Sequence, residues 1–136
     1  MARRILKDKR VTIYVQVSKT DSAGFPVTGY MPIDATGGGR WAYYRQMGGM
    51  AYWASDSLQT KADVEFVIGY DPLIAHAVDF ERIYIDYGGR LYQVSRVDTF
   101  EGYRRDLTVY ATAKKSTGGV GKPLAYDAAT VAKTLG

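Results

Sequence analysis

A pair of glycines between two alternating segments constrains this chain more than any other feature. Residues 82–95 read R-I-Y-I-D-Y-G-G-R-L-Y-Q-V-S, with Gly88 and Gly89 at the centre. A two-residue Gly-Gly loop favours a type I′ turn, which requires positive φ at both central positions. Closing the hairpin there pairs Ile85 with Tyr92, and a slip of one residue would turn every apolar side chain to the wrong face. The sequence therefore predicts an antiparallel hairpin with a fixed register.

Four further segments alternate between apolar and polar residues, as half-buried strands do. They cover residues 11–17, 40–47, 60–70 and 104–113. Together with the hairpin they make six strands, which we expect to follow one another up and down. The predicted fold class is all-β: a small antiparallel six-stranded β-barrel with one short helix and long loops.

The loops and ends complete the predicted organisation. Residues 18–39 are rich in glycine and proline and exceed the ~12–15 residues beyond which loops are usually functional or disordered, so we expect a long mobile loop there. The short helix is expected at 50–58, with a second capped segment near the end of the chain. We divide the chain into a basic N-terminal arm (1–10), a barrel domain (11–114) and a flexible C-terminal tail (115–136) with a short helix.

The composition excludes several kinds of active site. The chain has no cysteine and one histidine, His76, so it cannot form disulfides or a zinc site that needs several histidines. The G-x-G-x-x-A match at 37–42 follows a Gly/Pro loop and opens a strand, whereas a dinucleotide site needs a helix. Asp63 and Glu65 share one strand face, which we interpret as a solvated outer surface. The sequence predicts no catalytic residue, no metal, no cofactor, no signal peptide and no membrane span.

The positive charge of the chain is concentrated at its start. The arm carries a net charge of +4, whereas the rest of the chain is neutral, and its basic residues are Arg3, Arg4, Lys7, Lys9 and Arg10. Two interpretations remain open at this point. The arm is either a solvated fringe or a contact for an acidic protein or nucleic acid.

Aromatic residues are too numerous for one small core. The chain has 12 tyrosines and 2 tryptophans, so some of these rings must face outward. Outward rings serve either as stacking platforms for bases or as anchors of protein interfaces. Since few lysines and arginines are interleaved with them, we favour protein interfaces.

The order of these features resembles the head–tail joining (head completion, or stopper) proteins of long-tailed bacteriophages and prophages. The resemblance covers residues 10–113. It rests on Trp41-Ala42 in the second strand, V-E-F-V-I-G-Y at 64–70, the Gly-Gly hairpin and a closing strand from Arg105. It leaves open whether the chain is a stopper, an adaptor or a tail-side completion protein.

The resemblance implies a structural virion protein made in the bacterial cytoplasm. Copies would form a ring below the portal or its adaptor, close the DNA-filled head and offer the tail its attachment surface. The implied partners are the portal or adaptor, a tail completion or terminator protein, other copies of the chain and packaged double-stranded DNA. Alone, the chain is expected to be a monomer. The alternatives are a tail-side terminator or tail-tube protein and a nucleic-acid-binding barrel.

Site residues follow from the same resemblance. A channel or gate segment would contain Gly48, Gly49, Met50, Tyr52, Trp53 and Asp56. Loops at the ring interface would contain Phe25, Tyr30, Leu73 and His76. The alternative for the gate segment is a helix that covers the open end of the barrel, with Trp53 as its lid.

Overall fold

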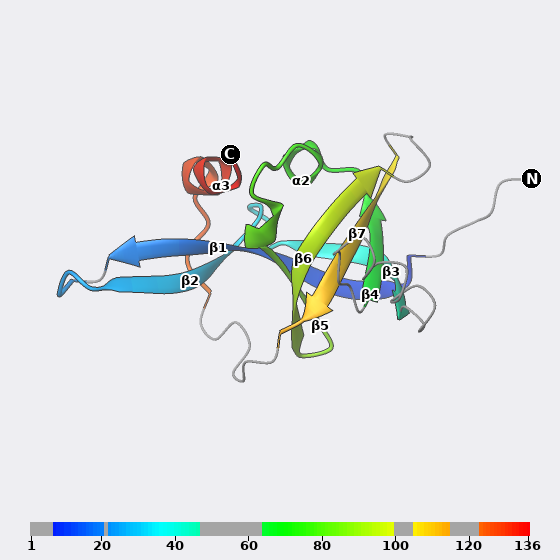
Figure 1. The fold of residues 1–136 in the computed structure, drawn as a ribbon, viewed down its shortest axis with the longest axis horizontal. Coiled ribbons are helices and arrows are strands. Elements are labelled where there is room, and N and C mark those ends of the chain that lie inside the picture. The colour runs from blue at the N-terminus through cyan, green and yellow to red at the C-terminus, as the bar shows by residue number, and fades with distance from the viewer. Residues whose placement is uncertain (1–6, 21, 47–63, 100–104, 115–122) are drawn as a thin grey trace, which may run out of the picture.

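One antiparallel sheet of seven strands dominates the described part of the computed structural model (Figure 1). The structure describes residues 7–20, 22–46, 64–99, 105–114 and 123–136. The strands are β1 (Lys9–Thr20), β2 (Pro26–Pro32), β3 (Gly39–Gln46), β4 (Val64–Gly69), β5 (Ile83–Tyr87), β6 (Arg90–Thr99) and β7 (Asp106–Ala113). The described helices are α2 (Pro72–Ala75), the 3-10 turn η1 (Phe80–Arg82) and α3 (Ala128–Leu135). None of these described helices has the length and apolar character needed to cross a membrane.

The sheet closes on itself through β1. The strand order is β2-β1-β3-β4-β7-β6-β5, and β5 also pairs with β1, for example Ile85 with Ile13. The described strands other than β2 therefore form a closed six-stranded antiparallel barrel, which confirms the predicted fold class. The expected up-and-down succession is wrong, because β1 lies between β3 and β5 and because β4 pairs with β7.

Apolar side chains fill the barrel. Along β1, Val11, Ile13, Val15 and Val17 are all buried, as their alternation predicts. Phe66 on β4 is fully buried, and its ring centroid lies 5.4–5.9 Å from those of three tyrosines, Tyr44, Tyr87 and Tyr92. Tyrosine therefore contributes to the core as well as to the surface.

The Gly-Gly hairpin has the predicted geometry. β5 and β6 pair Ile85 with Tyr92 and Tyr87 with Arg90. Gly88 has φ +61° and Gly89 has φ +80°. The predicted turn and register are both confirmed.

The long loop expected at 18–39 is wrong. β1 continues to Thr20 and β2 returns beside it, with Thr20 opposite Pro26, so that a two-stranded ribbon extends beyond the barrel (Figure 1). Proline is tolerated at the ends of a strand that lies on the edge of a sheet. Among the described strands β2 pairs with β1 alone, so Pro26 and Pro32 at its two ends fit such an edge position.

The C-terminal residues pack against the barrel. The predicted short helix near the end of the chain is present as α3, and its Val131 and Leu135 side chains belong to the hydrophobic core. The carbonyl of Leu135 accepts hydrogen bonds from the backbone N–H groups of Val78 and Asp79, at 2.8 and 3.0 Å. The sequence did not reveal this packing. The helix expected at 50–58 lies outside the described residues.

Candidate functional site

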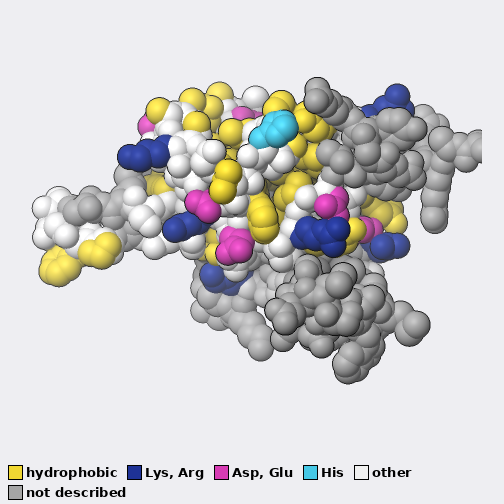
Figure 2. Space-filling model, turned by 45° about the horizontal axis from the view of Figure 1, so that its top comes forward, with side chains coloured by type: hydrophobic (Ala, Val, Ile, Leu, Met, Phe, Trp, Pro, Cys, Tyr) yellow, Lys and Arg dark blue, Asp and Glu magenta, His cyan; other side chains and the backbone are white. Residues whose placement is uncertain are grey.

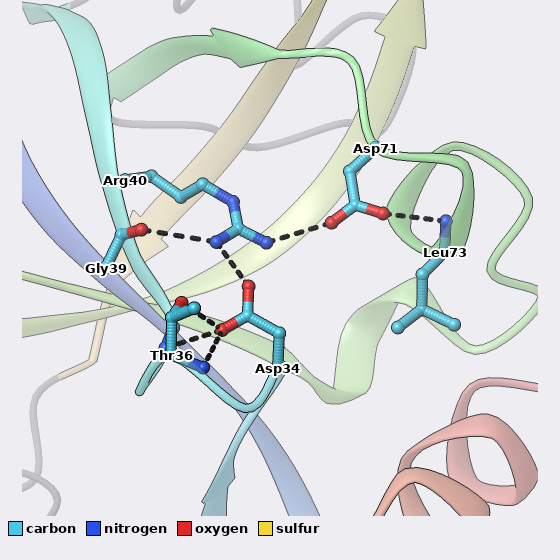
Figure 3. Close-up of polar contacts among 7 residues, drawn as sticks. Asp34, Thr36, Gly39, Arg40, Asp71 and Leu73 are labelled. Atoms are coloured by element: carbon cyan, nitrogen blue, oxygen red, sulfur yellow. Dashed lines mark hydrogen bonds and ion pairs between the residues drawn. The ribbon is translucent and has the colours of Figure 1, made fainter.

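Arg40 joins three separate segments of the barrel (Figure 3). Its guanidinium lies 2.5 Å from the carboxylate of Asp34, which follows β2, and 2.9 Å from that of Asp71, which precedes α2. A third hydrogen bond runs from the guanidinium to the carbonyl of Gly39, at 3.2 Å. Arg40 itself is on β3, so these contacts tie the turn after β2 and the start of α2 to the barrel wall.

Asp34 organises the turn that leads from β2 to β3. Its Oδ1 accepts hydrogen bonds from the backbone N–H groups of Thr36 and Gly38, at 3.0 and 3.1 Å, and from the Thr36 hydroxyl at 2.6 Å. Burial acts to raise the pKa of Asp34, but these hydrogen bonds and the Arg40 guanidinium outweigh it and lower the pKa to about 2. The carboxylate is therefore charged across the neutral range, and the turn is held by a permanent ion pair.

Asp71 begins α2 and places two of the predicted interface residues. Its Oδ1 accepts a hydrogen bond from the backbone N–H of Leu73 at 2.9 Å, as a helix N-cap does. Leu73 packs at the edge of the core, while the His76 side chain is exposed, with its Nε2 3.4 Å from the Tyr70 hydroxyl. These two residues thus lie on one rigidly capped turn.

The four predicted ring-interface residues form two groups. Leu73 and His76 lie on and just after α2, whereas Phe25 and Tyr30 belong to the β1–β2 ribbon. Phe25 is at the tip and is 67% exposed, but Tyr30 is on β2 and meets the Tyr84 ring edge-on at 5.2 Å. The structure therefore does not gather these residues into one surface, and their role in a ring stays a prediction.

The basic arm is partly built into the barrel. Lys7 pairs with Asp106 at 2.8 Å, and the Asp106 side chain is only 11% exposed. Lys9 lies 3.7 Å from Asp8. Both Lys9 and Arg10 lie on β1, which places the barrel boundary before residue 11. Arg3 and Arg4 lie outside the described residues.

The gate segment cannot be placed. All of its predicted residues lie outside the described part of the chain: Gly48, Gly49, Met50, Tyr52, Trp53 and Asp56. Its role stays a prediction.

Glu65 corrects the interpretation of the carboxylate pair. It is 9% exposed and lies 2.9 Å from the Nε of Arg45, so it is a buried ion-pair partner and not part of a solvated outer face. Asp63 lies outside the described residues. Within the described ranges, no three histidine or acidic side chains come together as metal ligands would.

Some large apolar side chains are exposed on the described part of the chain. Among the described residues, the large hydrophobic side chains with substantial exposure are Phe25 (67%), Trp41 (57%), Val78 (72%) and Tyr126 (39%). Hydrophobic side chains at the far end of the projecting ribbon are visible in Figure 2. Trp41 lies beside Arg10, whose guanidinium is 5.3 Å from the centre of the ring. The sequence analysis used Trp41 as a strand marker and did not predict its exposure.

A groove of about 370 Å³ lies between β1, η1 and α3. Most of the residues that line it have polar side chains, among them Gln16, Asp79, Arg82 and Lys133. Its two basic groups and one acidic group do not define a ligand.

Comparison with known proteins identifies a matching family and similar solved structures. The model of a family described as phage head completion protein matches residues 6–114. The solution structure of protein SF1141 from Shigella flexneri 2a has a TM-score of 0.60 at 16% identity, over 80% of this chain and 94% of that chain. At this identity the likeness shows a shared fold. No curated protein matches the sequence.

Proposed function

The chain belongs to the phage head completion protein family, a structural family of the phage particle, and on that premise we propose that its copies form a ring below the portal or its adaptor. The ring closes the DNA-filled head and provides the surface to which the tail attaches. The observation that carries this proposal is the family match, which spans the whole barrel from β1 to β7.

The packed interior of the barrel supports an assembly of several copies. Ile13, Phe66 and Ile68 are fully buried inside the barrel, so DNA has no path through a single copy. A channel for DNA therefore has to lie between copies arranged around an axis. Exposed aromatic side chains on the outer surface, Phe25 and Trp41, suit contacts between proteins.

The proposed neighbours are the portal or adaptor on the head side and a tail completion or terminator protein on the tail side. The basic arm, Arg3, Arg4, Lys7, Lys9 and Arg10, is proposed to contact an acidic neighbour or to face the DNA channel, although Lys7 also pairs with Asp106. The segment at 48–60 is proposed to face the channel and help to retain DNA. Shortening residues 48–58 in assembled particles tests this role, and full DNA retention with normal tail attachment would favour the lid alternative.

Heads made without this protein test the proposal. We expect them to package DNA but to lose it and to remain tailless, and we expect added purified protein to restore tail attachment. Electron microscopy and a DNase-protection assay report these two outcomes. Heads that keep their DNA and join tails normally would contradict the proposal, and tails of abnormal length beside intact heads would favour a tail-side terminator.

A further inference from the structure

We infer that the β1–β2 ribbon of one copy contacts the Arg10–Trp41 surface of the next copy. The inference rests on the proposed ring and names the two surfaces that join its neighbours. We call residues 16–30 the ribbon, and Arg10 with Trp41 the receiving surface.

The ribbon lies outside the barrel. β5 pairs with β1 as far as Val15, opposite Ile83, and among the described strands the residues of β1 beyond that point pair with β2 alone. A two-stranded ribbon has little stability of its own, and its free edges invite pairing with other chains. The outer part of the ribbon therefore presents strand edges that no other described strand covers.

Contacts at its base hold the ribbon in one position. The Tyr30 ring meets that of Tyr84 at 5.2 Å, and the Tyr30 carbonyl accepts a hydrogen bond from the Leu124 N–H at 2.8 Å. The Leu124 side chain lies so close to Gly29 that a Cβ there would overlap it. α3 packs against β1 from another side. A segment fixed in this way loses little conformational entropy when it binds a partner.

The tip of the ribbon carries an aromatic anchor. Phe25 is 67% exposed and stands between Gly24, at φ +87°, and Pro26, whose ring fixes its own φ. Figure 2 shows the apolar end of the ribbon standing clear of the body of the molecule. An exposed aromatic side chain is a common centre of binding energy in protein interfaces.

The receiving surface has the complementary composition. Trp41 is 57% exposed, and β1 and β3 pair it with Arg10, so both side chains lie on the same face of the sheet. The guanidinium lies over the indole ring at 5.3 Å. Tryptophan and arginine are the residues most enriched at the energetic centres of interfaces, and the indole offers a flat apolar face to a second aromatic ring.

The two surfaces lie at opposite ends of the same strand. Arg10 is near the start of β1, whereas Thr20 is its last residue and leads to the tip. At about 3.3 Å per residue the strand separates them by roughly 30 Å. Two different patches on opposite sides of a subunit join neighbouring copies head to tail. This kind of contact generates a ring when the successive rotations from copy to copy lead back to the first copy.

Crosslinking tests the inference directly, because the chain has no cysteine of its own. Ser22→Cys marks the tip and Asp8→Cys marks the receiving surface, and both side chains are exposed. In heads assembled with the full-length double variant, a bis-maleimide of about 10 Å should give a ladder of oligomers. Heads with an equal mixture of the two single variants should give nothing larger than dimers, and either single variant alone should give none. The matched control pairs Ser22→Cys with Ala35→Cys, an exposed position on another loop, and should give no ladder.

A second measurement uses the side chains themselves. Phe25→Ala and Trp41→Ala should each reduce incorporation into heads at least tenfold while the unfolding temperature changes little. Val78→Ala, at an exposed position away from both surfaces, should leave incorporation unchanged.

Heads that contain the double-cysteine variant at normal copy number but give no ladder would overturn the inference and leave the proposed function intact. A tip that crosslinks to a different head or tail protein would also overturn it, whereas heads that never contain the chain would overturn the proposed function.

Discussion

The guanidinium of Arg40 donates a hydrogen bond of 2.9 Å to the carboxylate of Asp71, and this contact holds the start of α2 against β3. Asp34 occupies the other side of the same guanidinium. The three charged side chains are only partly exposed, so loss of the guanidinium would leave two part-buried carboxylates without their counter-ion.

Replacement of Arg40 should therefore destabilise the fold. We expect Arg40→Ala to lower the free energy of unfolding by about 1–3 kcal/mol, because two part-buried carboxylates lose their counter-ion. Arg90→Ala removes an exposed arginine beside the Gly-Gly turn and should change it by less than about 0.5 kcal/mol. Urea unfolding measures both, and equal effects of the two variants would show that the Asp34–Arg40–Asp71 cluster does not stabilise the barrel.

Acid should weaken the same cluster through Asp34. Its pKa of about 2 lies below the ordinary value of 3.8, so its stabilising contribution is complete above about pH 4 and is lost as the pH falls toward 2. Asp34→Asn should consequently unfold with a shallower pH dependence between pH 4 and 2. The exposed carboxylate of Asp8 supplies the control, since Asp8→Asn should keep the slope of the unaltered protein. A slope in Asp34→Asn as steep as that of the unaltered protein would assign the acid sensitivity to other groups.

Two neighbouring glycines should differ sharply in their tolerance of alanine. Gly37 and Gly38 both have positive φ, but a Cβ on Gly37 meets open space, whereas one on Gly38 would overlap the backbone carbonyl oxygen of Ile13. Gly37→Ala should cost about 1–2 kcal/mol of strain, and Gly38→Ala at least about 3 kcal/mol. Thermal unfolding compares them, and similar melting temperatures would contradict the close approach of the turn to β1.

The C-terminal helix should contribute strongly to stability. Leu135 is 1% exposed, so Leu135→Ala should lower the free energy of unfolding by about 2–4 kcal/mol. Ala132→Ser, on the exposed side of the same helix, should cost less than about 1 kcal/mol. If Leu135→Ala proved as mild as Ala132→Ser in chemical unfolding, α3 would not be packed in solution.

The first arginines should matter for attachment and not for folding. We expect Arg3→Ala with Arg4→Ala to leave the unfolding temperature unchanged and to weaken binding to heads, with the greatest loss at low salt, because high salt already screens these two charges in the unaltered protein. Lys7→Ala is the contrasting variant, because it strips Asp106 of its ion pair and should lower stability. Normal attachment of the double variant at every salt concentration would favour the alternative interpretation, in which the arm is a solvated fringe.

Local chemistry explains which elements the sequence could predict. The Gly88–Gly89 turn and its register follow from backbone conformations that glycine adopts readily, so both were predictable. Asp71 followed by Pro72 is a helix-start signal, because aspartate caps and proline suits the first helical position. The sequence analysis ended a strand at residue 70 and predicted no helix directly after it, and thus missed α2.

Other features depend on partners that no local pattern reveals. β2 contains two prolines and a glycine, which are typical of loops. It is nevertheless a strand, because its backbone pairs with the edge of β1. Arg40 finds Asp34 and Asp71 only after three segments have come together. The burial of Val131 and Leu135 depends in the same way on the finished barrel.

The central position of β1 has a consequence for how the chain is made. This strand leaves the ribosome before its partners, yet β5, which closes the barrel against it, begins only at Ile83, and α3 begins at Ala128. During that interval Val11, Ile13, Val15 and Val17 lack the part of the core that β5 and α3 supply, in a segment with high β-propensity and no proline. Such delayed long-range pairing slows folding and exposes nascent chains to aggregation. The strand that closes the barrel is therefore also the segment that chaperones would need to shield for longest during synthesis.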